Sequence, residues 1–260
     1  MGTETIIAWT NHTFNISWGC VKVSPGCAHC YAETGSKRYG HSVWGPTAPR
    51  RIFGESHWNE PLKWNREAEK ERSRHRVFTS SMCDVFEQHK MIDKEREKLW
   101  PLIRNTPWLD WQVLTKRSER IADNLPKDWG TGYSNVWLGV SAEDQKYYEQ
   151  RWADLAPIPA VVRFVSYEPA LGPIELCAGL NPEHGSVFPD WIIYGGESGP
   201  GFRKADLAWP RSMRDQCKKL GIPFFHKQSS GIRTEMGIQL DGAIIREYPA
   251  PRGNQVQSLF

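Results

Sequence analysis

Short apolar, β-prone runs recur along this chain and alternate with stretches of helical composition. The runs lie at 76–80, 111–114, 136–140, 161–165, 191–194 and 222–225. Helical stretches separate them at about 93–105, 117–124, 143–155, 169–178 and 206–220. Strands that alternate with helices are typical of βαβ units and a parallel sheet.

The two ends of the chain complete this pattern. Residues 15–18 are predicted to form the first barrel strand, which brings the count to about seven, and residues 31–40 and 59–73 are predicted helices. We therefore expect an α/β fold, a partial or near-complete (β/α) TIM-type barrel over 1–228, with an irregular insertion at about 40–76. An Asp241-Gly242 turn predicts a hairpin in the segment 229–260, followed by a loose tail.

Composition narrows the class of protein. The chain has 260 residues, which suits one barrel, and no apolar run approaches the eighteen residues of a membrane span. The polar amino end lacks the apolar core of a signal peptide, and six cysteines in 260 residues do not make a disulfide framework. We expect a protein of the cytoplasm with reduced thiols and no membrane partner.

Three of the cysteines are close together near the amino end. Cys20, Cys27 and Cys30 have the spacing C-x6-C-x2-C, in a loop tightened by Ser24-Pro25-Gly26. Thiolates bind soft metals, and a [4Fe-4S] cluster held by three of them keeps one iron open for a small molecule. This is the arrangement of radical S-adenosylmethionine (SAM) enzymes. The rings of His29 and Tyr31 are candidates to flank the SAM adenine.

Polar residues follow nearly every predicted strand, where the active site of a parallel barrel lies. Ser81, Ser141 and Glu197 are candidates to hold SAM, and the glycines around Glu197 would let backbone approach a ligand. Lys116, Glu168 and Lys227 are candidates to hold the substrate. For each residue alone, a solvated loop or helix-entry position is an equally good interpretation, while Cys83 and Cys217 are better explained as buried core residues.

The motifs taken together resemble a known family. The pieces are Ile7-Ala8-Trp9-Thr10, the cysteine loop, 114–117, 137–141, Glu168-Pro169, 195–201 and 223–228. They are similar to the phage Gp37/Gp68 family (DUF5131), whose members are radical-SAM-like. The resemblance implies a barrel and a cluster, and its phage association implies a nucleic-acid substrate.

The leading interpretation is thus a radical SAM enzyme that takes electrons from an external donor and acts on a DNA base or its modified side chain, by rearrangement or repair. Arginines and lysines interleave with Trp44, Trp58 and Trp64 in the insertion, a composition that suits nucleic acid, although such tryptophans more often pack a helix onto the core. One alternative is a zinc-stabilised nucleic-acid-binding module that adds His29 or His12 to the three cysteines. Another is thiol redox chemistry at Cys27 and Cys30.

Overall fold

The structure, a computed structural model, describes residues 5–177 and 187–251. Within these ranges seven strands form the large sheet, in the order β1-β4-β5-β6-β7-β8-β9. Their bounds are β1 His12–Phe14, β4 His75–Thr79, β5 Leu109–Thr115, β6 Val136–Ser141, β7 Val162–Tyr167, β8 Trp191–Gly195 and β9 Phe224–Gln228. The pairs β1–β4, β4–β5, β7–β8 and β8–β9 are parallel. The predicted α/β class and partial (β/α) barrel are confirmed.

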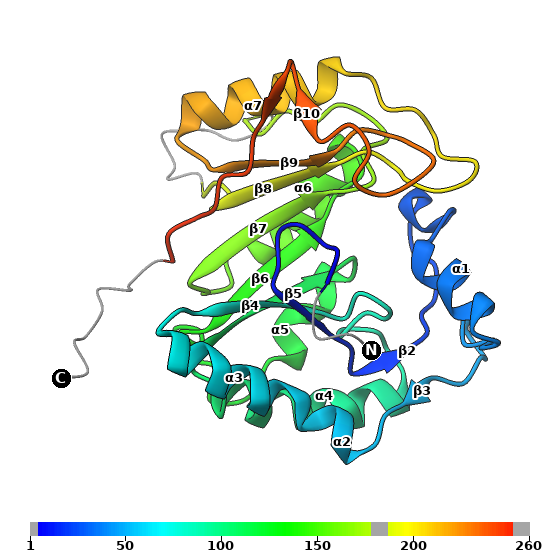
Figure 1. Cartoon of the computed structure of the whole chain (residues 1–260), viewed down its shortest axis with the longest axis vertical. Coiled ribbons are helices and arrows are strands. Elements are labelled where there is room, and N and C mark those ends of the chain that lie inside the picture. The colour runs from blue at the N-terminus through cyan, green and yellow to red at the C-terminus, as the bar shows by residue number, and fades with distance from the viewer. Residues whose placement is uncertain (1–4, 178–186, 252–260) are drawn as a thin grey trace. The chain divides into compact units, whose positions relative to one another are not determined.

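The chain divides into two compact units, residues 1–137 and 138–260. In the first unit, α3 (Glu60–Glu71) packs on β4 and β5, and α4 (Lys90–Arg104) connects these two strands (Figure 1). Ile92, Leu99 and Ile103 of α4 are buried, and their separations of seven and four residues place them on one face of the helix. An amphipathic stripe of this kind explains why this stretch forms a helix against a sheet. The shorter helices of the unit are α1 (Tyr31–Arg38), α2 (Glu55–Trp58) and α5 (Ile121–Asn124).

The first barrel strand is not the one that the sequence predicts. Residues 12–14 pair with β4, whereas β2 (Ser17–Trp18) leaves the large sheet and pairs antiparallel with β3 (Arg51–Ile52). The change of direction occurs at Asn15, whose side chain accepts a hydrogen bond from the Met82 amide at 2.6 Å. Each segment combines a buried aromatic residue with a buried polar one, Phe14 with His12 and Trp18 with Ser17, so composition could not separate them.

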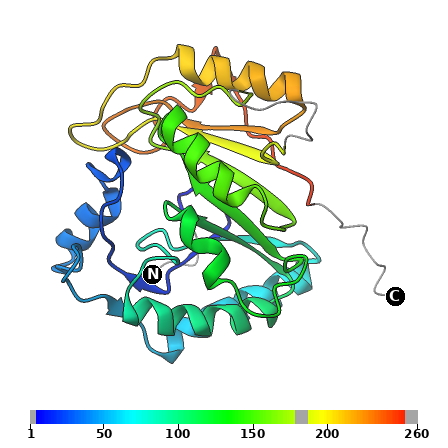
Figure 2. The ribbon, with the colours of Figure 1, turned by 180° about the vertical axis from the view of Figure 1, so that it is seen from behind.

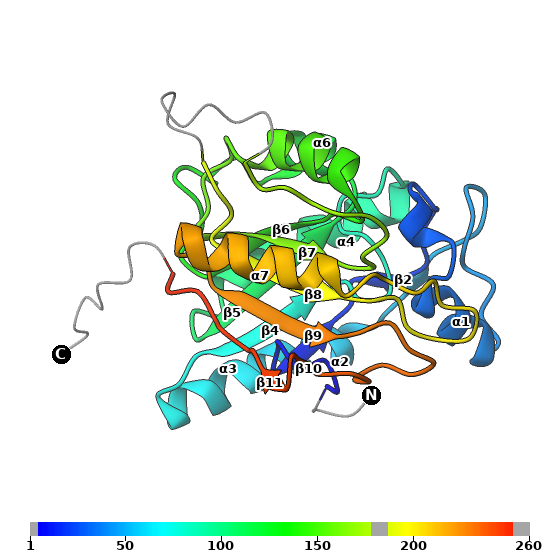
Figure 3. The same ribbon diagram turned by 90° about the horizontal axis from the view of Figure 1, so that it is seen from above.

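In the second unit, α7 (Ala208–Leu220) packs on β9, and α6 (Gln145–Leu155) follows β6 (Figures 2 and 3). The helix predicted over 169–178 is wrong for residues 169–177, and residue 178 lies outside the described ranges. Pro169, Gly172 and Pro173 disfavour a helix. Other elements satisfy the backbone instead: the Leu171 amide donates to the Glu143 carbonyl at 2.8 Å, and the Leu176 amide donates to Gln216 Oε1 at 2.7 Å.

The carboxyl-terminal hairpin is confirmed. β10 (Gln239–Leu240) and β11 (Ala243–Ile244) pair antiparallel around Asp241 and Gly242. Both turn residues have positive φ, 52° and 81°, which an Asp-Gly pair adopts readily. Beyond the hairpin, the His226 amide donates to the Ile245 carbonyl at 2.8 Å and the Glu247 amide donates to the Phe224 carbonyl at 3.1 Å, so residues 245–247 run along β9. The predicted tail beyond residue 251 lies outside the described residues.

The predicted insertion at 40–76 is only partly irregular. It contains β3, α2 and α3, and the helix predicted over 59–73 is confirmed as α3. Trp64 is buried and stacks on His12 with ring centroids 4.4 Å apart. Arg50 is also buried, whereas Lys63, Arg66, Lys70 and Arg72 are exposed. Across the described ranges, no helix has the length and apolar character needed to cross a membrane.

Candidate functional site

The cysteine loop, residues 20–30, connects β2 to α1 in the first unit. A short 3-10 turn, η1 (Pro25–Cys27), shapes its middle, and Cys30 is the residue that caps the start of α1. Gly19 opens the loop with φ of 116°, and a Cβ there would come within 2.3 Å of the Val43 carbonyl oxygen. Only glycine can adopt this φ and also fit this close to Val43, so the entry of the chain into the cysteine loop requires a glycine immediately before Cys20.

The three thiols do not occupy equivalent surroundings. Burial raises the pKa of Cys30, while the amides of Glu33 and Ala32 at the start of α1 and the charge of Lys116 act in the opposite direction. Burial also raises the pKa of Cys20, which lies against Arg117, with its Sγ 3.5 Å from Nη1. Among the residues that the structure describes, no three His, Cys, Asp or Glu side chains are grouped so as to hold a metal ion. The ligand set Cys20, Cys27 and Cys30 therefore stays a prediction.

Buried charges lie behind the loop. Arg117 donates to Asp84 Oδ2 at 2.9 Å, and Arg50 donates to both oxygens of Glu87 at 2.8 Å. All four side chains are buried. Asp84 and Thr115 belong to the polar residues that follow or end the predicted strands, whereas nothing in the local sequence identifies Glu87 or Arg50 as partners.

The structure brings several predicted site residues of the first unit together. The Tyr31 hydroxyl donates to the Ser81 carbonyl at 2.9 Å, and the Asn15 amide donates to Ser81 Oγ at 3.1 Å. Ser80, just before, has φ of 71°, an uncommon conformation for a residue with a side chain. The loop after β4 is thus fixed beside the start of α1, while His29 is exposed. Lys116 is half-buried, and its charge acts on Cys30.

In the second unit, the predicted substrate residues Glu168 and Lys227 form an ion pair with each other. They follow or end β7 and β9, and Gly195 at the end of β8 makes room between them: a Cβ on Gly195 would lie 2.7 Å from Glu168 Cδ. The carboxyl ends of β7 and β9 flank that of β8, and two of their polar residues meet across it, at the end of the strands where the barrel rule places the active site.

The predicted SAM residues of the second unit have other partners. The Ser141 carbonyl accepts from Arg151 Nη1 at 2.7 Å, and the fully buried Glu143 pairs with the same guanidinium at 3.0 Å. Glu197 accepts from the Arg203 amide at 2.7 Å and from Arg203 Nε at 2.9 Å, so this carboxylate closes its own glycine-rich loop. Arg151 and Arg203 could not be found by sequence reasoning, because nothing in their spacing distinguishes them from surface arginines.

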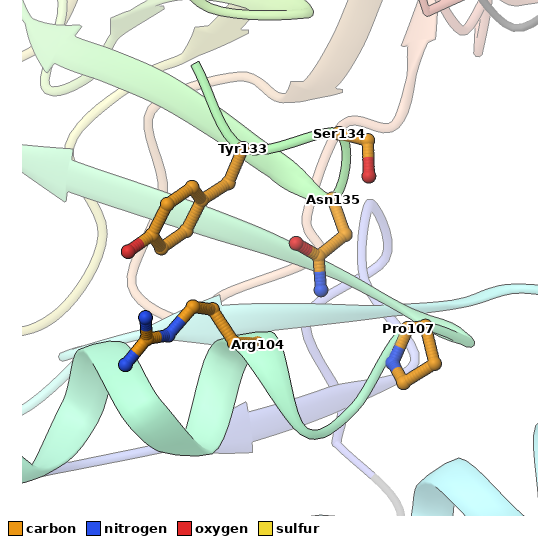
Figure 4. A pocket seen from close by; sticks show the side chains of 5 residues that line it. All are labelled: Arg104, Pro107, Tyr133, Ser134 and Asn135. Carbon is orange, nitrogen blue, oxygen red and sulfur yellow. The ribbon is translucent and has the colours of Figure 1, made fainter. Parts of the chain in front are cut away.

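A small pocket lies at the opposite end of the strands of the first unit (Figure 4). Arg104, Pro107, Tyr133, Ser134 and Asn135 line it. Its volume of about 170 Å³ is below the usual range of small-molecule sites. None of the predicted site residues lines it, and it precedes β5 and β6 rather than following them. It is therefore not the candidate site.

Comparison with known proteins identifies the family. The sequence matches the family described as "Protein of unknown function (DUF5131)" over residues 4–249. The chain belongs to the DUF5131 family. The DUF5131 assignment agrees with the sequence motifs, and no curated protein matches the chain.

Solved structures similar to this DUF5131 member are spore photoproduct lyases. A doubly substituted mutant of that enzyme, with bound AdoMet and dinucleoside spore photoproduct, has a TM-score of 0.51 and 13% identity. A singly substituted mutant has a TM-score of 0.51 and 14% identity. In both cases the match covers 84% of this chain and 64% of the other, so this chain corresponds to less than two thirds of those proteins. At these identities the likeness shows a shared fold.

His226, next to Lys227 on β9, is a buried titratable group. Its ring stacks on Tyr194 with centroids 5.4 Å apart, and Nε2 lies 3.1 Å from the Gly237 carbonyl oxygen. Nδ1 is buried and has no hydrogen-bond partner among the described residues. Burial lowers the pKa of His226, so the ring is neutral in the folded protein, with its proton on Nε2.

This predicts a pH dependence of stability. As the pH falls below about 6.5, the unfolded chain binds a proton that the folded His226 does not, so the free energy of unfolding decreases, by at most about 1.4 kcal/mol per pH unit. His226→Gln, which retains a donor for the Gly237 carbonyl, should reduce this slope. Urea unfolding at several pH values between about 5 and 7.5 measures it. Equal slopes in the two proteins would contradict the prediction.

Proposed function

We propose that this chain is a radical SAM enzyme that acts on a nucleic-acid base or its modified side chain. The observation that carries the proposal is the three-cysteine loop placed at the start of a partial (β/α) barrel. The fold likeness to a spore photoproduct lyase with bound AdoMet and dinucleoside spore photoproduct supports the substrate class. The chemistry of the donor set fits a [4Fe-4S] cluster, because three thiols from one loop leave one iron open.

The roles of the residues follow from their positions. Cys20, Cys27 and Cys30 would hold the cluster, and because the three sulfurs do not meet at one point, the loop has to draw together as the cluster assembles. His29 and Tyr31 would flank the adenine, with Ser81, Ser141 and Glu197 as further SAM contacts. When bound, the cluster and SAM supply reductive cleavage of the sulfonium, with an electron from an external donor, and a radical that removes hydrogen from an unactivated carbon.

The rest of the chain binds the substrate and excludes water. Lys116, Glu168 and Lys227 are the polar strand-end residues proposed to contact the substrate. A lysine ammonium can bind a phosphate as a point charge, and a carboxylate can accept a hydrogen bond from a base or sugar. The Glu168–Lys227 ion pair would hold both groups at fixed positions before the substrate arrives.

Cleavage of SAM tests the proposal. Anaerobically reconstituted protein reduced with dithionite is expected to form 5′-deoxyadenosine, and ultraviolet-irradiated DNA should increase the rate over that with undamaged DNA. Lys116→Ala should reduce the stimulation by DNA, because a phosphate contact is lost, while Lys127→Ala, which removes an exposed lysine ahead of β6 and outside the cysteine loop, should not. Absence of 5′-deoxyadenosine above the level without reductant would refute the proposal. If 5′-deoxyadenosine forms at a rate that neither kind of DNA changes, the radical SAM activity stands and only the proposed nucleic-acid substrate is wrong.

A further inference from the structure

Arg117 is placed where the cysteine loop meets the end of β5. Its guanidinium donates to the Val21 carbonyl at 2.9 Å from Nη2 and to Asp84 Oδ2 at 2.9 Å from Nη1. Nη1 also lies 3.5 Å from Cys20 Sγ. The side chain is buried, with a relative exposure of 6% for the residue. One planar group therefore holds the Val21 backbone and the sulfur of the first cysteine at the same time.

The acidic partners of the Arg117 guanidinium are themselves held by other residues. The Thr115 hydroxyl donates to Asp84 Oδ1 at 2.7 Å, and the Lys116 amide donates to Asp84 Oδ2 at 3.1 Å, so this carboxylate is locked to the turn after β5. Glu87 Oε1 lies 3.7 Å from Arg117 Nη2 and also pairs with Arg50. The position of Arg117 is therefore determined by the loop after β4 as well as by its own strand.

The charges of this buried group of side chains balance, and Arg117 is the one of its two arginines that contacts Cys20 Sγ. Asp84 and Glu87 balance Arg50 and Arg117. Burial alone lowers the pKa of Arg117, but Asp84 and Cys20 beside it raise the pKa by more, so the guanidinium stays charged. A thiolate at Cys20 would be shielded from water, and the Arg117 guanidinium would be its nearest positive charge among these buried side chains.

We propose that Arg117 is a positioning residue that holds Cys20 and the adjacent Val21 in place for ligation and raises the reduction potential of the cluster. The inference rests on the proposed function. Its physical basis is that hydrogen bonds and positive charge at a ligating sulfur favour the reduced, more negative cluster. The neutralising carboxylate of Asp84 moderates the effect, so the two residues should act in opposite directions.

Amide hydrogen exchange of the protein without cluster tests the positioning role. In Arg117→Met, peptides from the cysteine loop should exchange several-fold faster than in the wild type, because the donors to Val21 and Cys20 are lost. Arg120→Met is the matched control: Arg120 is three residues away and donates to the Phe86 carbonyl at 2.8 Å, not to the loop. Unchanged exchange in a folded Arg117→Met variant would overturn the positioning role.

The reduction potential of the reconstituted protein, followed by EPR, tests the electrostatic role. Arg117→Met should shift the midpoint potential to more negative values, and Asp84→Asn should shift it to less negative values, whereas Arg120→Met should leave it unchanged. A purely structural role would lower cluster content without shifts of opposite sign. If Arg117→Met does not fold, the Asp84→Asn variant alone tests the electrostatic role: a less negative midpoint potential supports it, and an unchanged or more negative one overturns it.

The outcomes separate this inference from the proposed function. A wild-type protein that binds no cluster refutes the proposed function, while faster exchange in Arg117→Met would still support the anchoring of the loop. A wild-type protein that binds the cluster, with the same potential in all variants, refutes the role assigned to Arg117 and leaves the enzyme proposal intact.

Discussion

Replacing Cys27 or Cys30 with alanine is expected to abolish iron and sulfide binding by the anaerobically reconstituted protein. The wild type should hold about four irons and four sulfides per chain, because a cube needs four metal positions and three thiolates leave one open. Cys20→Ala should have the same effect, since the other thiols of the described chain lie outside the loop. Iron and sulfide analysis provides the measurement, together with the absorbance at roughly 410 nm that is typical of thiolate-ligated clusters.

The control for this experiment is Cys217→Ala. Cys217 is buried in α7, and burial raises its pKa to about 12, which marks a core thiol rather than a ligand. This variant should retain the full iron and sulfide content. Stoichiometric zinc without sulfide in the wild type would contradict the prediction and favour the zinc-stabilised module instead.

Replacing Arg50 with methionine is expected to destabilise the protein by about 3–5 kcal/mol, as breaking a buried ion pair does. The variant removes the close ion-pair partner of Glu87, which keeps the longer contact of 3.7 Å to Arg117, and removes donors from the Val43, Gly45 and Ala48 carbonyls. The double variant Arg50→Met/Glu87→Leu should recover part of the loss, because it removes the unpaired charge but not the unpaired carbonyls. Urea unfolding followed by circular dichroism measures all three proteins.

Arg51→Met is the matched control, one residue away. Arg51 is half-buried and stacks over Trp18 at 4.4 Å from the ring centroid, so its loss should cost about 1 kcal/mol or less. A destabilisation of Arg50→Met as small as that of Arg51→Met would show that the buried pair with Glu87 contributes little.

Much of the fold was predictable because buried parallel strands leave a strong signal. Runs such as 136–140 and 191–194 are apolar, β-prone and bounded by polar residues, and each forms a strand within a residue or two of its predicted bounds. The segment 169–177 was not predictable in the same way. Its backbone amides donate hydrogen bonds to Glu143, Gln145 and Gln216, which are far away in sequence. The composition of the segment therefore gives no information about these partners.

The candidate site was only partly predictable, for a similar reason. The cysteine spacing and the polar strand ends are local features, and they identified Lys116, Glu168 and Lys227 as neighbours of a strand end. Arg50 is one of the insertion arginines that the sequence pattern links to nucleic acid, but its side chain is buried against Glu87 and cannot belong to such a surface. A pair of charges 37 residues apart depends on tertiary packing, which no single stretch of sequence encodes.

The segment that follows the carboxyl-terminal hairpin runs antiparallel to β9, with Arg246 bridged to Phe225. β9 is the last strand of the large sheet, and an uncovered last strand offers its amides and carbonyls to any other chain. Asp241 at the hairpin turn pairs with Arg211 and Arg214 of α7, which fastens this cover. A protein shortened before Gln239 would therefore expose the edge of β9 to pairing with strands of other molecules. Its main defect would be self-association rather than a loss of site residues.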